Sequence, residues 1–119
     1  MMKLSHDHKL IITIIKKGRA EKIIEAARTA GARGGTIMHG RGVGVHEHKK
    51  ILGIPIEPEK EIVLTLIHED KVDVVLKAIV EAGNLNKPGT GIGFVLDVEK
   101  VVGIVGLVEP FPEWNETKE

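Results

Sequence analysis

The sequence predicts an α+β domain, a ferredoxin-like β-α-β-β-α-β plait with an extra C-terminal strand, and the first reason is an internal repeat. Ile11–Ile15 aligns with Val63–Ile67 at an offset of 52 residues, and the same offset relates the helical patterns that follow the two runs. The second reason is the long segment between the halves, which carries glycine and proline. Each half therefore reads as strand, helix, strand, and both helices are expected on one face of a four-stranded antiparallel sheet.

The first half contains two expected strands and one helix. Leu10–Ile15 is almost entirely apolar or β-branched, which is typical of a strand covered by other structure. A shorter strand is expected around Thr36–Met38. Between them, apolar residues recur with the spacing of one helix face after Arg19, and Gly31 is expected just past the helix end. The positions on that face are Ala20, Ile23, Ile24, Ala27 and Ala30.

The second half repeats this order with different ends. Glu61–Ile67 is the expected strand, Asp70 is the expected cap of the next helix, and Gly83 is expected to end that helix. A glycine-rich turn then leads into strands expected over Phe94–Val98 and Lys100–Val108. The helix pattern in this half consists of Val72, Val75, Leu76, Ile79 and Ala82.

The segment Arg41–Glu59 joins the two halves. It contains glycines, prolines and the charged run His46–Lys50, and it shows little periodicity. We expect a long loop without regular structure, and we expect residues from about Val43 to Glu57 to be mobile in the absence of a partner or ligand. Loops of such length in small domains are usually functional or disordered.

Composition indicates one domain over residues 1–119, with a core at about 9–107 and a loose tail at 109–119. The chain has 17 basic and 17 acidic residues and only three aromatic residues, which argues against nucleic-acid binding. There is no cysteine, so a disulfide, a thiol nucleophile and a thiolate metal site are excluded. No apolar run approaches about 18 residues, so we expect a cytoplasmic protein without membrane insertion.

The second face of the expected sheet is the reason to expect an oligomer. The strands are apolar at successive positions, so the face away from the helices is apolar as well. A bare apolar sheet face is an association surface.

Two glycine clusters are the candidate ligand site. Asn86–Val98 contains Gly89, Gly91 and Gly93, and a glycine turn that enters a strand can present backbone N–H groups to an anion. The other cluster lies upstream, and we expect the two to face one another across a cleft between subunits. The upstream cluster consists of Gly34, Gly35, Gly40, Gly42 and Gly44.

Over about residues 9–107 the chain resembles the PII family of nitrogen-regulatory signal proteins. The residues that carry the resemblance are Gly35–Ile37, Gly40–Gly44 and Gly91–Val102, together with the spacing between them. The resemblance implies a non-enzymatic regulator that forms a compact homotrimer and binds adenine nucleotides in three inter-subunit clefts. It also implies a mobile T-loop, here about Gly42–Glu59, that docks onto a target such as a transporter or a metabolic enzyme, in nitrogen or carbon metabolism.

The chain departs from this family at the residues that hold phosphate. The family's arginine and glutamine after the first glycine motif are replaced by Val45 and His46, its loop lysine by Ile92, and two arginines on the last strand by Gly103 and Val105. The T-loop tyrosine is absent, since the chain contains no tyrosine. Because each lost charge-assisted contact is worth roughly 1.5–3 kcal/mol, we expect AMP or ADP to bind at least as well as ATP.

The resemblance assigns residues to two sites. Lys60 is the loop-base cation that persists, and Arg41 is a further candidate for phosphate. The nucleotide-binding set is Thr36, Gly42, Val43, Gly44, Lys60, Leu66, Gly89, Thr90, Gly91, Ile92, Gly93 and Phe94. The partner-binding T-loop set is His46, Glu47, His48, Lys49, Lys50, Ile51 and Leu52.

Histidine spacing supports an alternative hypothesis. His46 and His48 flank Glu47, and His6 and His8 flank Asp7, so each pair could chelate a transition metal from an extended chain. Solvated polar residues are the plain interpretation of such pairs. The alternative function is therefore a trimeric divalent-metal-binding protein of the cation-tolerance type. Catalysis has no support, since there is no triad order, Walker lysine or carboxylate pair near the glycine segments.

Overall fold

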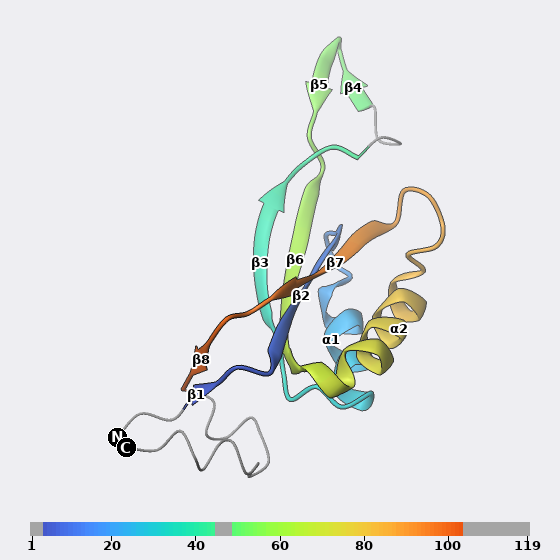
Figure 1. Cartoon of the computed structure of the whole chain (residues 1–119). Coiled ribbons are helices and arrows are strands. Elements are labelled where there is room, and N and C mark those ends of the chain that lie inside the picture. The colour runs from blue at the N-terminus through green and yellow to red at the C-terminus, as the bar shows by residue number, and fades with distance from the viewer. Residues whose placement is uncertain (1–3, 45–48, 104–119) are drawn as a thin grey trace.

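A computed structural model describes residues 4–44 and 49–103 and contains a four-stranded antiparallel sheet with both long helices on one face (Figure 1). The strand order is β3-β6-β2-β7, which confirms the predicted ferredoxin-like plait. The sheet strands are β2 (His8–Lys16), β3 (Thr36–Arg41), β6 (Glu59–His68) and β7 (Gly91–Asp97), and the helices are α1 (Ala20–Thr29) and α2 (Val72–Gly83). No helix in the described part of the chain has the length and apolar character needed to cross a membrane.

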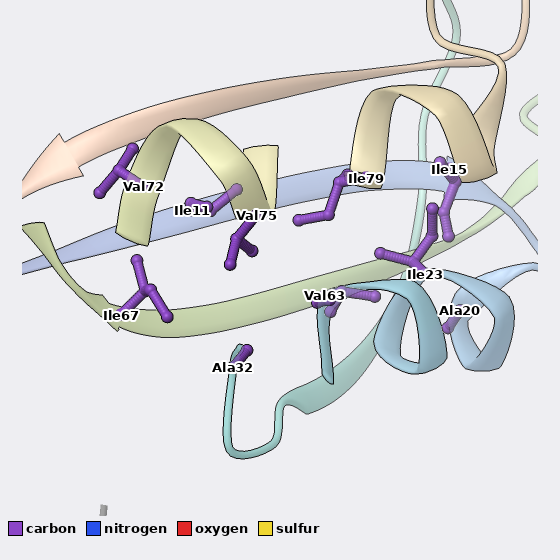
Figure 2. Packing of buried hydrophobic residues seen from close by; sticks show 11 residues of the cluster. Ile11, Ile15, Ala20, Ile23, Ala32, Val63, Ile67, Val72, Val75 and Ile79 are labelled. Atoms are coloured by element: carbon purple, nitrogen blue, oxygen red, sulfur yellow. The ribbon is translucent and has the colours of Figure 1, made fainter. Parts of the chain in front are cut away.

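The core lies between the helices and the sheet, as the two helical patterns predicted (Figure 2). Ile23 and Ile79, one from each helix, are fully buried against Ile11, Ile15 and neighbouring strand positions. Alternate strand residues face this layer because successive side chains of a strand point to opposite faces. The remaining members of the buried cluster are Ala20, Ala27, Ala32, Val63, Ile67, Val72 and Val75.

The opposite sheet face is apolar, and no helix of the described residues covers it, as predicted. Cross-strand pairing aligns Ile12 with Leu64 on one side and with Phe94 on the other, so these side chains share that face. We call it the open face. Met38, Phe94, Ile92 and Leu96 on it are 39–57% exposed. Its apolar members are Leu10, Ile12, Ile14, Met38, Ile62, Leu64, Leu66, Ile92, Phe94 and Leu96.

The second helical segment starts and ends differently from the predictions made for Asp70 and Gly83. Asp70 is not the cap of the second helical segment. Asp70 lies inside the short 3₁₀ turn η1 (Glu69–Lys71), and Nδ1 of His68 accepts the hydrogen bond from its N–H. The left-handed residue after α2 is Asn84, with φ 54°, while Gly83 is still helical. Gly31 follows α1 with φ 127°, as predicted.

The segment between the halves contains regular structure, which contradicts the expected structureless loop. β4 (Lys49–Ile51) and β5 (Ile54–Ile56) pair as a hairpin that stands away from the main sheet (Figure 1). Both turn residues, Leu52 and Gly53, have positive φ. A two-residue turn of this kind matches the right-handed twist of the two strands that it joins. The turn was missed because leucine is not a usual residue at its first position. His46, Glu47, His48 and Val45 lie outside the described residues.

The expected strand Lys100–Val108 is short within the described residues. Only β8 (Val101–Val102) forms, paired with β1 (Leu4–Ser5) as a separate ribbon. Gly103 has φ 80°, a conformation that leaves the extended region and ends the pairing. The residues from 104 onward, including Val105 and the expected tail, lie outside the described part.

Candidate functional site

A pocket of about 730 Å³ lies at the end of the sheet from which the β4–β5 hairpin departs. Four segments form it: β2 through Ile14, the end of β3 with the residues after it, the first half of β6, and the α2–β7 loop with the start of β7. The lining residues are Ile14, Gly40, Arg41, Gly42, Val43, Gly44, Lys60, Ile62, Leu85, Asn86, Lys87, Pro88, Gly89, Gly91 and Ile92.

Both glycine clusters contribute to this pocket from the same chain. Gly40, Gly42 and Gly44 line one side, and Gly89 and Gly91 line the other. The sequence hypothesis placed the clusters opposite one another across a subunit boundary, whereas they already meet within one chain. Gly34 and Gly35, the first members of the upstream cluster, are not lining residues.

The Gly42 backbone is held at the base of the hairpin. Its N–H donates a 3.1 Å hydrogen bond to the carbonyl oxygen of Pro58. Apart from Gly42 itself and its two chain neighbours, no described residue has an atom within 4 Å of the position that a Cβ on Gly42 would occupy. Gly42 therefore borders open pocket space while its amide ties the two ends of the connecting segment together.

The α2–β7 loop is shaped by its own hydrogen bonds. The hydroxyl of Thr90 donates to the carbonyl oxygens of Asn84 at 2.8 Å and Lys87 at 2.9 Å. The N–H of Lys87 donates to the carbonyl oxygen of Asn84 at 3.0 Å, and Gly89 turns the chain with φ 83°. Thr90, predicted to bind nucleotide, thus holds the loop together and does not line the pocket.

Gly91 is required by the sheet itself. Its φ is 153°, and a Cβ would lie 2.6 Å from the carbonyl oxygen of Ile14. The glycine pattern in the sequence assigned this residue to a turn that presents backbone N–H groups to an anion. The structure shows that a Cβ here would collide with β2, so a bulky residue at Gly91 would disturb the fold as well as any ligand.

The pocket combines an apolar floor with cationic residues. The apolar lining residues are Ile14, Val43, Ile62, Leu85, Pro88 and Ile92. The basic lining residues are Arg41, Lys60 and Lys87. Lys87 was absent from the predicted set, although its position beside Pro88 and Gly89 in the glycine loop was a usable signal. Such a site suits a ligand with an apolar or aromatic part and a small anionic part.

One carboxylate near the hairpin base has a perturbed pKa. Lys17 forms a 3.0 Å ion pair with Glu59. This lysine, through its hydrogen bond and then its charge, lowers the pKa of Glu59, and the charges of His39 and Arg41 act in the same direction. The carboxylate is exposed, so the pair is a surface feature of the strand that leads out of the hairpin.

Seven of the twelve predicted nucleotide residues line the pocket, and five do not. Thr36, Leu66 and Phe94 lie on the open face by their register. Gly93 lies opposite Thr13, on the helix side of the sheet. The seven that gather are Gly42, Val43, Gly44, Lys60, Gly89, Gly91 and Ile92.

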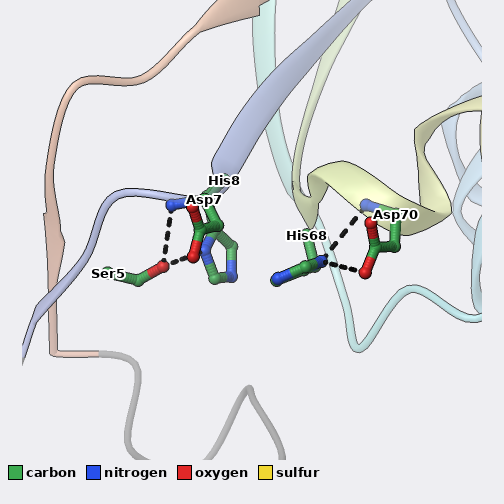
Figure 3. Close-up of polar contacts among 5 residues, drawn as sticks. All are labelled: Ser5, Asp7, His8, His68 and Asp70. Atoms are coloured by element: carbon green, nitrogen blue, oxygen red, sulfur yellow. Dashed lines mark hydrogen bonds and ion pairs between the residues drawn. The ribbon is translucent and has the colours of Figure 1, made fainter. Parts of the chain in front are cut away.

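The two histidines that lie together in the structure, His8 and His68, are not one of the pairs suggested by the sequence spacing. Nδ1 of His8 is 2.8 Å from Oγ of Ser5, whereas Nδ1 of His6 is 3.3 Å from the carbonyl oxygen of Glu99, so the two do not share a site. His8 instead faces His68 (Figure 3). Burial, and then His68, lower the pKa of His8, while the charge of Asp7 acts in the opposite direction.

Comparison with known proteins gives a family match. A family model described as Nitrogen regulatory protein P-II matches residues 8–105. No curated protein sequence matches. Among solved structures, the crystal structure of Arabidopsis thaliana PII bound to citrate is similar, with a TM-score of 0.63, 23% sequence identity and 80% of each chain covered. At that identity the structural likeness supports the fold, and the family rests on the sequence model.

Proposed function

The chain belongs to the nitrogen regulatory protein P-II family, and from that premise we propose that it is a regulatory protein that binds a small anionic effector in the pocket between its two glycine segments. The effector is an adenine nucleotide, with AMP or ADP bound at least as well as ATP. The protein acts on a partner through the segment Gly42–Glu59 and is not an enzyme.

The single observation that carries this proposal is the composition of the pocket. Glycines from two segments far apart in sequence line it, so backbone N–H groups can approach a ligand without Cβ atoms in the way. Lysine and arginine side chains line the same space as the apolar side chains of Ile14, Ile62 and their neighbours. A base placed on the apolar floor and a phosphate near the cations would use both kinds of surface.

The preference for fewer phosphates follows from the cations. The family's loop lysine is replaced by Ile92, which lines the pocket and is 57% exposed. Arg41, Lys60 and Lys87 remain. Every further phosphate loses hydration on binding and needs a compensating donor or charge. A triphosphate therefore gains little over a diphosphate, and its magnesium dependence is expected to be weak.

A homotrimer is part of the proposal. The open face exposes Met38, Phe94 and Leu96 on a continuous apolar surface, which a monomer would leave in water. Residues Thr36, Leu66 and Phe94 lie on this face, outside the pocket of their own chain. In the trimer they would serve a neighbouring subunit's ligand, so the complete site would use two chains.

Gly42 would couple ligand binding in the pocket to partner binding at the hairpin. This residue lines the pocket, and its N–H also closes the base of the β4–β5 hairpin on Pro58. A ligand that contacts Gly42–Gly44 therefore touches the start of the segment that ends in the hairpin. Lys50, Leu52 and Ile54 on the hairpin are exposed and available to a transporter or a metabolic enzyme of nitrogen or carbon metabolism. A ligand shifts such a segment only by its differential affinity for the segment's states.

Calorimetric titration of AMP, ADP and ATP, each with and without Mg²⁺, tests the proposal. Lys87→Ala should weaken all three nucleotides, since a charge-assisted contact of roughly 1.5–3 kcal/mol is lost. Gly42→Val should also weaken them, because its side chain enters open pocket space without a clash. Lys77→Ala is the matched control, since Lys77 is exposed on α2 and does not line the pocket.

Three results would count against parts of this proposal. Tight, magnesium-dependent ATP binding with weak AMP binding would show that the phosphate site is misjudged. Unchanged affinity in both pocket variants would remove the pocket as the site. Binding of citrate, the ligand in the Arabidopsis structure, with no nucleotide binding would keep the site but replace the effector.

A further inference from the structure

His8, which is buried, and His68, which is partly buried, form a pair at the end of the sheet opposite the hairpin (Figures 1 and 3). The two residues are direct partners in the β2–β6 register. Their ring planes are nearly perpendicular, at 80°, and the ring centroids are 5.6 Å apart. His8 is 4% exposed, and the side chain of His68 is 13% exposed.

The Nδ1 atom of each ring has its own hydrogen-bond partner, on the side away from the other ring. Nδ1 of His8 is 2.8 Å from Oγ of Ser5, and that oxygen also accepts a 3.1 Å hydrogen bond from the N–H of Asp7. Nδ1 of His68 accepts a 3.1 Å hydrogen bond from the N–H of Asp70, whose Oδ2 is 3.5 Å away. Figure 3 shows the result: each Nδ1 points to its own support, and the Nε2 edges of the two rings point toward one another.

We propose that the Nε2 atoms of His8 and His68 bind one divalent transition-metal ion of the Zn²⁺ class. Imidazole is a preferred ligand for such ions. With Zn–N bonds of about 2.0–2.1 Å, each ring centroid lies about 3.2 Å from the ion, and two rings at a tetrahedral angle are about 5.2 Å apart. The 5.6 Å separation of the centroids is close to that value, so small side-chain adjustments suffice.

The protons can be placed for this coordination. A histidine that binds metal through Nε2 carries its proton on Nδ1, and this proton needs an acceptor. Oγ of Ser5 is the acceptor for His8. In His68 the proton moves from Nε2 to Nδ1, and Oδ2 of Asp70 replaces the backbone N–H as the partner of Nδ1. The tautomer changes with no net gain or loss of protons.

The surroundings suit a dication with exchangeable ligands. Asp7 directly precedes His8, Asp70 follows His68 by two residues, and both carboxylates supply negative charge near the rings. Among the described residues no third histidine or carboxylate completes a metal-binding group. Water fills the other coordination positions. The ion would bridge β2 and β6 where the N–H of Glu69 already donates a 2.8 Å hydrogen bond to the carbonyl oxygen of Asp7.

Zinc calorimetry and thermal unfolding of the full chain at neutral pH test this site. The expected result is one Zn²⁺ per chain at this site and a higher Tm with Zn²⁺. His8→Asn and His68→Asn should each lower the affinity at least tenfold, since asparagine reproduces the Nδ1-side hydrogen bond and lacks Nε2. Asp70→Asn should weaken binding about tenfold through the lost support of His68.

Two control variants separate this site from the sequence-adjacent pairs. His6→Asn and the double variant His46→Asn/His48→Asn should keep the affinity of this site. Circular dichroism confirms that each variant folds. In the wild-type protein, Zn²⁺ should shift the imidazole NMR signals of His8 and His68 together. No Zn²⁺ binding, unshifted His8 and His68 signals, or binding lost only in the His46/His48 variant would each overturn the proposal.

Discussion

The carboxylate of Glu61, on β6, accepts a 2.8 Å hydrogen bond from the backbone N–H of Ala20, the first residue of α1. Arg19, which precedes the helix, makes no capping hydrogen bond with its side chain. The first turn of α1 is therefore capped by the Glu61 side chain of β6, 41 residues away in sequence. A carboxylate at this position also interacts favourably with the helix dipole.

Glu61→Ala should destabilise the protein by about 1 kcal/mol, the usual value for loss of an N-terminal cap. Glu61→Gln keeps an oxygen acceptor and should lose only part of this stability. Urea unfolding of the two variants measures the difference. Equal stability of Glu61→Ala and the wild type would show that water replaces the carboxylate without loss.

Gly91→Ala should destabilise the fold by roughly 2–3 kcal/mol, because the new Cβ meets backbone atoms and the residue has a φ that favours glycine. Gly42→Ala is the matched control from the same pocket. It has open space at its Cβ position and should change the unfolding free energy by less than about 0.5 kcal/mol. Similar midpoints for both variants in urea would contradict the close approach of Gly91 to β2.

Val75→Ala and Val74→Ala compare neighbouring positions on α2 with the same chemical change. Val75 is fully buried against the sheet, while Val74 is 53% exposed. Loss of two methyl groups from the core should cost about 2 kcal/mol, whereas the exposed site should change little. Both variants gain the same helix propensity, so the difference in unfolding free energy isolates burial.

Lys17→Ala should raise the pKa of Glu59 toward the ordinary value of a glutamate, since the lysine is the main cause of the lowered pKa. The folded-state pKa is below the unfolded one. The stabilisation is therefore present above the unfolded pKa and is lost as pH falls through the folded pKa. Carboxyl NMR titration of Glu59 gives the shift directly, and Lys22→Ala is a control on the outer surface of α1.

Phe94→Asp should dissociate the proposed trimer, because it places a charge on the open face. Light scattering should give three times the chain mass of 13.0 kDa for the wild type and a smaller mass for the variant. Val74→Asp, on a helix outside this face, should stay trimeric. A wild-type protein with the mass of one chain would refute the assembly.

The internal repeat, the two helix patterns and the apolar sheet face opposite the helices could all be predicted from the sequence. Spacing alone assigns Ile23 and Ile79 to the core, because a helix or strand imposes a short, regular period on the residues that share a face. Two glycine segments were likewise identifiable from the sequence as a candidate pocket. Family resemblance added the expected ligand and assembly.

The pairs of distant residues that meet could not be predicted from the sequence. Nothing local in the sequence relates Glu61 to the first turn of α1, His8 to His68, or Lys87 to Gly42. These neighbours depend on the β2–β6 register and on the path of the α2–β7 loop. A one-residue slip in a strand would turn each of its side chains to the other face. Local periodicity indicates which face of a helix or strand a residue occupies. Contacts between faces, loops and helix ends form only when the whole chain packs.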